Sequence, residues 1–197
     1  MTPASFIKSL GAMATASLLS VLPVSAATWS IDQEASTLGF EAQVFGSAVP
    51  GTFGDWEAEI VFDEEALNTS AVSVTINMSS ADTGDGSRDG SLRGSEWFAV
   101  EEHPEASLTS TAFRKLDDGS FEMDADLTMR GTTNAITLPF TLTEAADGVV
   151  AKGSVTVNRT DYGIGQGDYV SGATVGLDVV ISIDIAATPE VDADMEN

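Results

Sequence analysis

The chain has 197 residues, with 31 Asp and Glu against 8 Lys and Arg, a single His and no Cys, and its formal net charge is −23. Such an excess of negative charge repels nucleic acids and anionic lipid surfaces. The absence of Cys excludes disulfides, thiol catalysis and Cys-ligated metal sites. We interpret the acidic surface as a solubility feature.

The first 27 residues have the pattern of a Sec-type signal peptide. Lys8 provides a positive charge, residues 10–22 form an apolar and small-residue run, and small residues precede the expected cleavage site at Ala26 or Ala27. The run is too short for a transmembrane helix, which needs about 20 apolar residues. We therefore expect a signal peptide at 1–27, one exported domain at 28–187 and an acidic, disordered tail at 188–197, with no stable membrane insertion.

Most of the remaining sequence alternates between apolar and polar residues with a period of two, which is typical of half-buried β-strands. In chain order we expect strands at residues 28–32, 37–45, 52–63, 71–79, 106–113, 121–130, 135–143, 149–158 and 175–187. We expect a turn at 46–51, a polar loop at 82–90, a short helix at 91–98, and hairpin turns at 117–119 and 146–148.

The strand expected at residues 121–130 shows the alternation most clearly. One face is apolar and consists of Phe121, Met123, Ala125, Leu127 and Met129. Carboxylates and Arg130 take the other face, so a slip by one residue would bury several charges. The register of this strand is therefore tightly determined.

About eight or nine strands with hairpin spacing and hardly any helix predict an antiparallel all-β domain. A closed barrel and a two-sheet sandwich both fit this pattern. The interior of an eight-stranded barrel is just wide enough for side chains or for one slim ligand. Small residues at expected inward positions favour a cavity; these are Ala42, Ala58, Ala112, Ala125 and Gly153.

The residue inventory does not predict catalysis or metal binding. His103 is the only histidine, and because Pro104 follows it we interpret it as a surface turn residue. One His and no Cys cannot assemble a zinc site of the usual composition. The acids of residues 82–90 lack the spacing of a calcium loop, and the glycines of residues 163–167 lack the context of a dinucleotide site. We expect no enzyme activity, no catalytic residue, no metal and no cofactor.

Three arginines are candidates for contact with a polar or anionic head group. Arg88 and Arg93 flank the expected helix, and Arg159 opens a loop between two strands. A guanidinium group suits phosphate because it donates two parallel hydrogen bonds. The alternative is that these arginines pair with Asp89 and Asp161, which are close in sequence.

Aromatic residues form the second candidate set, either as packed core or as the lining of a ligand cavity. They are Phe40, Phe53, Trp97, Phe98, Phe113, Phe140 and Tyr162. Burial of such a side chain contributes about 1.5–3 kcal/mol whether its neighbour is protein or lipid, so apolarity alone leaves both alternatives open.

A set of short segments follows a characteristic order and spacing along the expected domain. They are WSID at 29–32, STLGF at 36–40, GTF at 51–53, IVFD at 60–63, Thr83, RD at 88–89, LR at 92–93, WF at 97–98, HP at 103–104, ST at 110–111, DLTMRGTT at 126–133 and RTDYG at 159–163. Together they resemble the YceI-like family of exported lipid-binding proteins. One departure is that Glu34 and Ala35 precede Ser36, where that family often has a His.

The resemblance implies an elongated, lipocalin-like, antiparallel eight-stranded barrel with one short helix, located in the periplasm or secreted. Its apolar interior would hold a polyisoprenoid lipid of the isoprenoid quinone or prenyl phosphate type, and no catalysis is implied. On this basis Leu127 and Met129 become candidate lipid contacts beside the aromatic and arginine residues named above. We expect a monomer or homodimer that binds no nucleic acid. The alternative function is that of a solid-cored secreted β-domain for stress response or protein interaction.

Overall fold

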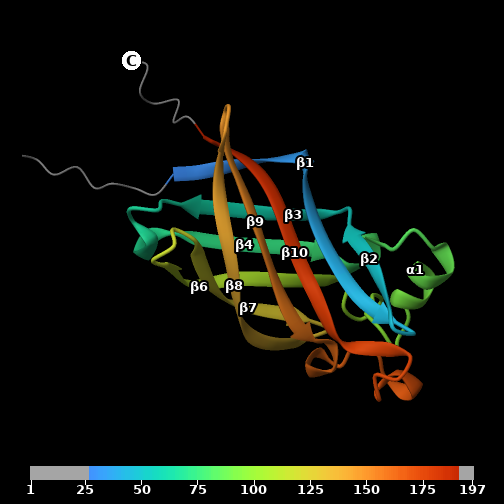
Figure 1. The fold of residues 1–197 in the computed structure, drawn as a ribbon. Helices are drawn as coiled ribbons and strands as arrows, with labels where there is room; N and C mark the ends of the chain where they lie inside the picture. Colours follow the sequence, from blue (N-terminus) through green and yellow to red (C-terminus); the bar gives the residue numbers. More distant parts are fainter. Residues whose placement is uncertain (1–26, 191–197) are drawn as a thin grey trace, which may run out of the picture.

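The computed structural model describes residues 27–190, which form one antiparallel sheet closed into a barrel (Figure 1). Its strands are β1 (Ala27–Val44), β2 (Ser47–Phe53), β3 (Trp56–Phe62), β4 (Ala71–Asn77), β5 (Ala81–Asp82), β6 (Glu105–Lys115), β7 (Phe121–Met129), β8 (Thr132–Ala145), β9 (Gly148–Asn158) and β10 (Val175–Pro189). The strand order is β10-β9-β8-β7-β6-β4-β3-β1-β2-β5, and the β10–β1 pair closes the sheet. Short helices lie in the connections: α1 (Gly86–Leu92), η1 (Leu67–Thr69), η2 (Met78–Ser80), η3 (Arg159–Tyr162) and η4 (Gly167–Tyr169).

Two of the barrel strands are bent, so the ten segments correspond to eight strands around the barrel. β1 pairs first with β3, where Trp29 lies opposite Ile60, and then with β2, where Leu38 lies opposite Phe53. β2 and β3 thus form one strand interrupted at residues 54–55, and η2 interrupts β4 and β5 in the same way. The predicted closed eight-stranded antiparallel barrel with one short helix is confirmed, and the sandwich alternative is excluded by the β10–β1 pairing.

β7 has the predicted alternation of buried and outward residues. The apolar residues at alternate positions from Phe121 to Leu127 are at most 5% exposed. On the outer face, Arg114 of β6 forms an ion pair with Asp124. Hydrogen bonds from Arg114 and then from Thr137 lower the pKa of Asp124 to about 2, so this carboxylate stays ionised at neutral pH. The register that buries the apolar face therefore also brings opposite charges together outside.

β1 contains a bulge opposite β10. Residues 33–36 of β1 lie opposite a single residue of β10, Ile185. The carboxylate of Asp32 accepts hydrogen bonds from two backbone N–H groups within the bulge, and the Ser36 hydroxyl hydrogen-bonds both backbone groups of Ala186. Because a bulge turns the strand that carries it, β1 diverges from β3 after only three paired residues. A gap between β1 and β3 follows from this divergence.

The two ends of the barrel differ (Figure 1). The hairpin end carries the loops at residues 63–70, 116–120 and 146–147, together with the first and last described residues. The helix end carries α1, η3, η4 and the β1–β2 turn. Phe98, Tyr162 and Ile164 are buried at the helix end, within the main hydrophobic core. The helix end is therefore packed with side chains from its own loops.

The structure corrects the position of the helix, which was predicted at residues 91–98. α1 begins earlier because the carboxylate of Asp85 accepts hydrogen bonds from the backbone N–H groups of Ser87 and Arg88, and so caps the helix at its first turn. The two glycines within the helix made this segment resemble a loop in the sequence.

The turn predicted at residues 46–51 is also wrong, because most of this segment belongs to β2. Gly51 lies opposite Phe40, whose ring covers it so closely that an added Cβ would meet ring carbon at 2.3 Å. Pro50 is tolerated because β2 pairs with β5 only at its last two residues, so the missing N–H faces no partner. The Pro-Gly sequence thus marks an unpaired edge with a close aromatic contact.

The predicted domain limits meet the described residues only in part. β10 continues to Pro189, two residues beyond the predicted end of the domain at 187. The predicted signal peptide, apart from Ala27, lies outside the described residues, as do residues 191–197 of the predicted acidic tail.

Phe45 provides a test of the β1–β2 turn. Its φ is 49° and its side chain is 79% exposed, although bulky residues rarely adopt positive φ. Phe45→Asn creates an Asn-Gly pair with Gly46, the sequence favoured in two-residue hairpin turns. We expect the free energy of unfolding to rise by about 1 kcal/mol and the Tm by about 2–4 °C in thermal denaturation. Phe45→Ala is the control, because it removes the ring but keeps the strained conformation; an equal gain in both variants would contradict this explanation.

Candidate functional site

The interior of the barrel holds a cavity of about 410 Å³. Inward side chains from all strands except β5, together with Met78 of η2 and two residues of the β3–β4 loop, line it. All of these side chains are apolar except Asp63 and Glu64 of that loop. Both acids belong to the β3–β4 loop at the hairpin end. A volume of this size lies in the range of small-molecule sites, which are mostly apolar with few polar groups. The cavity is therefore a candidate site for an apolar ligand with its polar end near Asp63 and Glu64.

Five of the predicted site residues line this cavity, namely Phe53, Phe113, Leu127, Met129 and Phe140. Near the hairpin end, the Phe62 ring lies 5.6 Å from that of Phe113 and 6.0 Å from that of Phe140, in edge-to-face geometry. Leu127 and Met129 lie at the other end of β7, so the predicted residues span the length of the cavity.

Four predicted aromatic residues lie beyond the cavity, at its helix end. Phe40 packs against Phe53 with ring centroids 5.1 Å apart, and Phe98 follows at 6.3 Å from Phe53. Tyr162 is 2% exposed, and its burial raises the pKa of its hydroxyl. Trp97 packs on the ring of Tyr169 at 4.9 Å. These side chains close the helix end of the barrel, and a ligand role for them stays a prediction.

Arg159 is buried in the helix end, with 2% of its surface exposed. Its guanidinium group donates hydrogen bonds to five backbone carbonyl oxygens, those of Ile164, Gly165, Tyr169, Val175 and Gly176. Burial lowers the pKa of the guanidinium group from its usual value. Gly165 has a φ of 78° and approaches so closely that an added Cβ would meet Arg159 Nη1 at 1.9 Å. Arg159 thus holds the loop between β9 and β10 in place, and its donors point at protein carbonyls.

Arg88 and Arg93 belong to the segment around α1, away from the cavity lining. Arg88 donates to the carbonyl oxygen of Thr83, and Arg93 donates to that of Ser79. Asp89 accepts hydrogen bonds from the hydroxyl and then from the backbone N–H of Thr83, and both lower the pKa of its carboxyl group. The ion pairs found within residues 27–190 include neither Arg88 with Asp89 nor Arg159 with Asp161. A head-group role for the three arginines stays a prediction.

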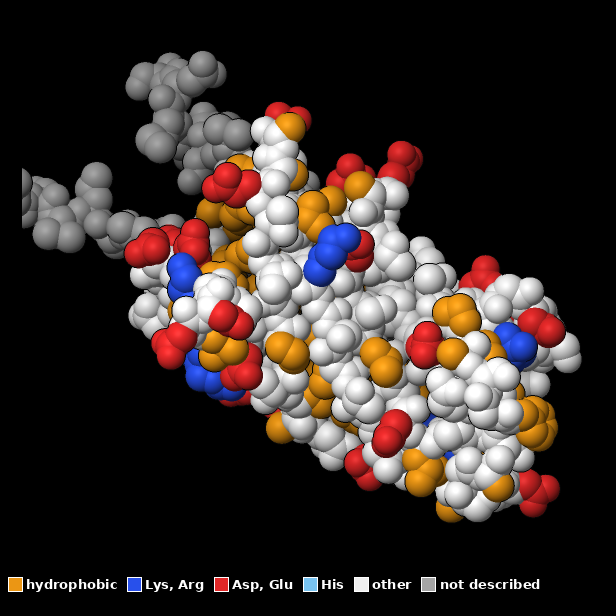
Figure 2. Space-filling view, in the orientation of Figure 1, with side chains coloured by type: hydrophobic (Ala, Val, Ile, Leu, Met, Phe, Trp, Pro, Cys, Tyr) orange, Lys and Arg blue, Asp and Glu red, His pale blue; other side chains and the backbone are white. Residues whose placement is uncertain are grey.

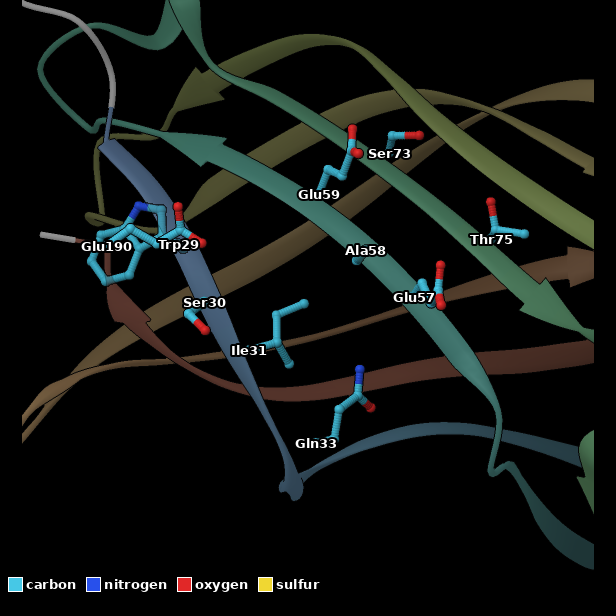
Figure 3. Close-up of a pocket in the computed structure, with 10 residues that line it drawn as sticks. All are labelled: Trp29, Ser30, Ile31, Gln33, Glu57, Ala58, Glu59, Ser73, Thr75 and Glu190. Carbon is cyan, nitrogen blue, oxygen red and sulfur yellow. The ribbon is translucent and has the colours of Figure 1, made fainter. Parts of the chain in front are cut away.

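A second hollow, a groove of about 480 Å³, lies on the outside of the barrel along the gap between β1 and β3 (Figure 3). It shares Trp29, Ile31 and Ala58 with the lining of the cavity. The other side chains along it are polar: Ser30, Gln33, Glu57, Glu59, Ser73, Thr75 and Glu190. Gln33 spans the gap by donating a hydrogen bond to the carbonyl oxygen of Trp56. The groove is open and polar, so it suits an apolar chain less well than the interior.

Several lining residues were missing from the predicted site, including Trp29, Trp56 and Phe62. Their signal was present in the sequence, because Trp56, Ala58, Ile60 and Phe62 alternate in phase along β3. The choice among inward residues requires knowing how deep each lies in the barrel, and alternation does not contain that information.

Residues 27–190 contain no group of three or more His, Cys, Asp or Glu side chains placed to hold a metal ion. His103 lies beside Gly131, which belongs to the turn between β7 and β8, and His103 is absent from the cavity lining. Within the same residues, no helix is long and apolar enough to cross a membrane.

A closed antiparallel barrel with an apolar interior places the protein among small β-barrels that can hold a ligand. Residues 29–187 match the YceI-like domain, and the chain belongs to this family. It is 32% identical over 193 residues to Protein YceI of Escherichia coli O17:K52:H18, covering 90% of this chain and 96% of that protein. It is 36% identical over 132 residues to a UPF0312 protein of Photorhabdus laumondii, covering 66% of this chain and 68% of that protein.

Solved structures share the fold. The structure of BcnA from Burkholderia cenocepacia superposes with a TM-score of 0.76 at 21% identity, over 79% of this chain and 98% of that one. A polyisoprenoid binding domain from Saccharophagus degradans, implicated in plant cell wall breakdown, superposes with a TM-score of 0.64 at 16% identity, over 82% of this chain and 98% of that one. At these identities the likeness establishes the barrel fold.

Arg159 provides a test of how the helix end is closed. Arg159→Met leaves several buried carbonyl groups without donors, so we expect the free energy of unfolding to fall by about 3 kcal/mol or more, and the Tm by about 6–12 °C. Arg159→Lys restores part of the hydrogen bonding and should lie in between. The control is Arg114→Met, which removes an exposed ion-paired arginine and should cost about 1 kcal/mol or less. Equal losses for Met at positions 159 and 114, measured by thermal and urea denaturation, would contradict the closing role.

Proposed function

We propose that the protein binds a long isoprenoid lipid inside its barrel, as a non-catalytic carrier or store. The observation that carries this proposal is the cavity, in which the only polar lining side chains, Asp63 and Glu64, lie at one end. Transfer of an apolar chain from water into such an interior is favourable by about 25 cal/mol per Å² of apolar surface buried. A water-filled interior would lack the polar partners that buried water needs.

The relatives support this choice of ligand. The Saccharophagus degradans domain with the same fold is described as polyisoprenoid-binding. An isoprenoid quinone and a prenyl phosphate both present a flexible apolar chain with one polar end, which matches a cavity that is polar at one end only. The family membership and the residue inventory both favour a binding protein over an enzyme.

Export to the periplasm or beyond the cell belongs to the same proposal and is supported by the signal-peptide pattern of residues 1–27. We propose a monomer or homodimer that does not bind nucleic acid, since the net charge of −23 repels phosphate backbones. A solid-cored interaction domain is less well supported, because the barrel interior contains a cavity of about 410 Å³.

Native mass spectrometry tests the proposal on protein purified gently from cells of the producing bacterium. We expect a bound mass that disappears on organic extraction and that matches an isoprenoid lipid in the extract. Recovery of ligand-free protein alone, from cells rich in such lipids, would count strongly against lipid binding.

Filling the cavity should abolish binding without affecting the outer surface. Ala151 lines the cavity from β9, whereas Ser154 lies on the outer face of the same strand. We expect Ala151→Phe to weaken binding of farnesol by about tenfold or more, because the new ring occupies ligand volume. Ser154→Phe is the matched control and should bind as the unchanged protein does. Binding can be followed by the emission of Trp29 and Trp56, which line the cavity. Equal affinity in both variants, with both folded by circular dichroism, would place the ligand elsewhere.

A further inference from the structure

We propose that the cavity selects isoprenoid lipids whose head group carries no negative charge, such as a prenol or a quinone, and discriminates against prenyl phosphates. This inference rests on the proposed function and specifies the head group of its ligand. Three observations carry it: the side chains at the hairpin end, the partners of every cationic side chain, and the composition of the outer groove.

The hairpin end of the barrel is strongly acidic. Its three loops, at residues 63–70, 116–120 and 146–147, contain acids and no Lys or Arg. The acids at this end are Asp63, Glu64, Glu65, Asp117, Asp118 and Asp147, and Glu190 joins them at the end of the described chain. Figure 2 shows acidic side chains, with a few basic ones between them, around exposed apolar ones on this side of the molecule. A head group that projects from the cavity here meets negative charge.

The two acids that line the cavity are not neutralised equally. Glu64 forms an ion pair with Lys115, with 2.7 Å between Nζ and Oε2. Asp63 accepts a hydrogen bond from the backbone N–H of Glu65 and has no cationic partner among the ion pairs of residues 27–190. The mouth of the cavity, which is its hairpin end beside Asp63 and Glu64, therefore retains negative charge next to the position of a ligand head group.

Every cationic side chain in the described part of the chain already has a protein partner. Of the eight Lys and Arg residues, Lys8 lies outside residues 27–190 and seven lie within. Arg114 pairs with Glu122 and Asp124, Lys115 with Glu64, and Lys152 with Asp184, while Arg88, Arg93, Arg130 and Arg159 donate to backbone carbonyl oxygens. None of the seven lines the cavity. A phosphate at the mouth would therefore have to compete with these protein partners for a guanidinium or ammonium group, which is what phosphate recognition uses.

The gap between β1 and β3 offers no better place for a phosphate. The groove there shares three residues with the cavity lining, so it is the alternative route by which a head group could reach solvent. Its charged side chains are Glu57, Glu59 and Glu190, with no Lys or Arg among its lining residues. The hairpin end and the groove between β1 and β3 thus both favour a head group without negative charge.

The test compares three ligands that share one chain and differ only in charge: farnesylamine, farnesol and farnesyl phosphate. The phosphate carries about −1.5 to −2 charges at pH 7. Repulsion between such a group and several carboxylates near a protein surface corresponds to about tenfold weaker binding or more. We expect the amine to bind at least as tightly as the alcohol, and the phosphate at least about tenfold more weakly, in titrations followed by Trp29 and Trp56 emission.

Two further measurements identify the cause of the difference. Raising the ionic strength to about 1 M shortens the Debye length to about 3 Å, so the difference in affinity between farnesol and farnesyl phosphate should become smaller. The double variant Asp63→Asn and Glu64→Gln should also reduce this difference in affinity, because it strengthens the binding of farnesyl phosphate. The matched control is Asp126→Asn with Asp178→Asn, which removes two exposed charges from the outer faces of β7 and β10. This control should leave the difference in affinity between farnesol and farnesyl phosphate unchanged.

The outcomes separate this inference from the proposed function. Farnesyl phosphate binding as tightly as farnesol would overturn the inference while supporting lipid binding. An equal decrease of the affinity difference in both double variants would overturn the role of Asp63 and Glu64 at the mouth. Failure of all three ligands to bind would overturn the proposed function, and the head-group inference with it.

Discussion

Pairing between β1 and β10 is the contact on which the rest of the structure depends. It extends from Trp29 opposite Pro189 to Val44 opposite Val175, between the longest strands of the sheet. Closure removes both exposed edges of an otherwise open sheet and directs one face of every strand inward. Since eight strands set the diameter, the wall cannot collapse onto its own centre, and small inward residues such as Ala58 and Ala151 leave the space unfilled. The cavity is a consequence of closure combined with residue size.

The two ends of the cavity differ, and this difference would determine the orientation of a bound ligand. At the helix end, Arg159 donates hydrogen bonds to carbonyl oxygens of the β9–β10 loop and of the first two residues of β10, and Tyr162 and Phe98 are buried in the core there. At the hairpin end, the rings of Phe62, Phe113, Phe121 and Phe140 pack against one another, and the polar lining side chains lie only there. Under the proposed function, we therefore expect a bound apolar chain to have its buried end towards Arg159 and its polar end towards Asp63.

Local patterns in the sequence were enough for the strands and their faces, because period two and hairpin turns are local properties. They left a barrel and a sandwich equally possible, and the closed barrel was predicted only from the resemblance to the YceI-like family. β7 shows this well, since burial and outer ion pairs both follow from one alternation. The position of α1 was missed because one carboxylate, Asp85, decides where that helix begins. The environment of Arg159 was also not predictable, because its carbonyl partners come from residues 164–176, which only the folded loop brings around it. Depth along the barrel was the missing information for the site, and it depends on strand stagger as well as on periodicity.

The net charge of the protein acquires a local meaning once the cations are located. A net charge of −23 on its own indicates solubility, because charge speaks to the behaviour of the whole surface. Of the seven described cations, however, only Lys115 pairs with an acid that lines the cavity, and Asp63 beside that acid has no ion-pair partner among residues 27–190. The same shortage of Lys and Arg that keeps the surface acidic thus also sets the electrostatic character of the mouth. Under the proposed function, burial of the chain supplies affinity for any isoprenoid, and we propose that the charge at the mouth discriminates among head groups.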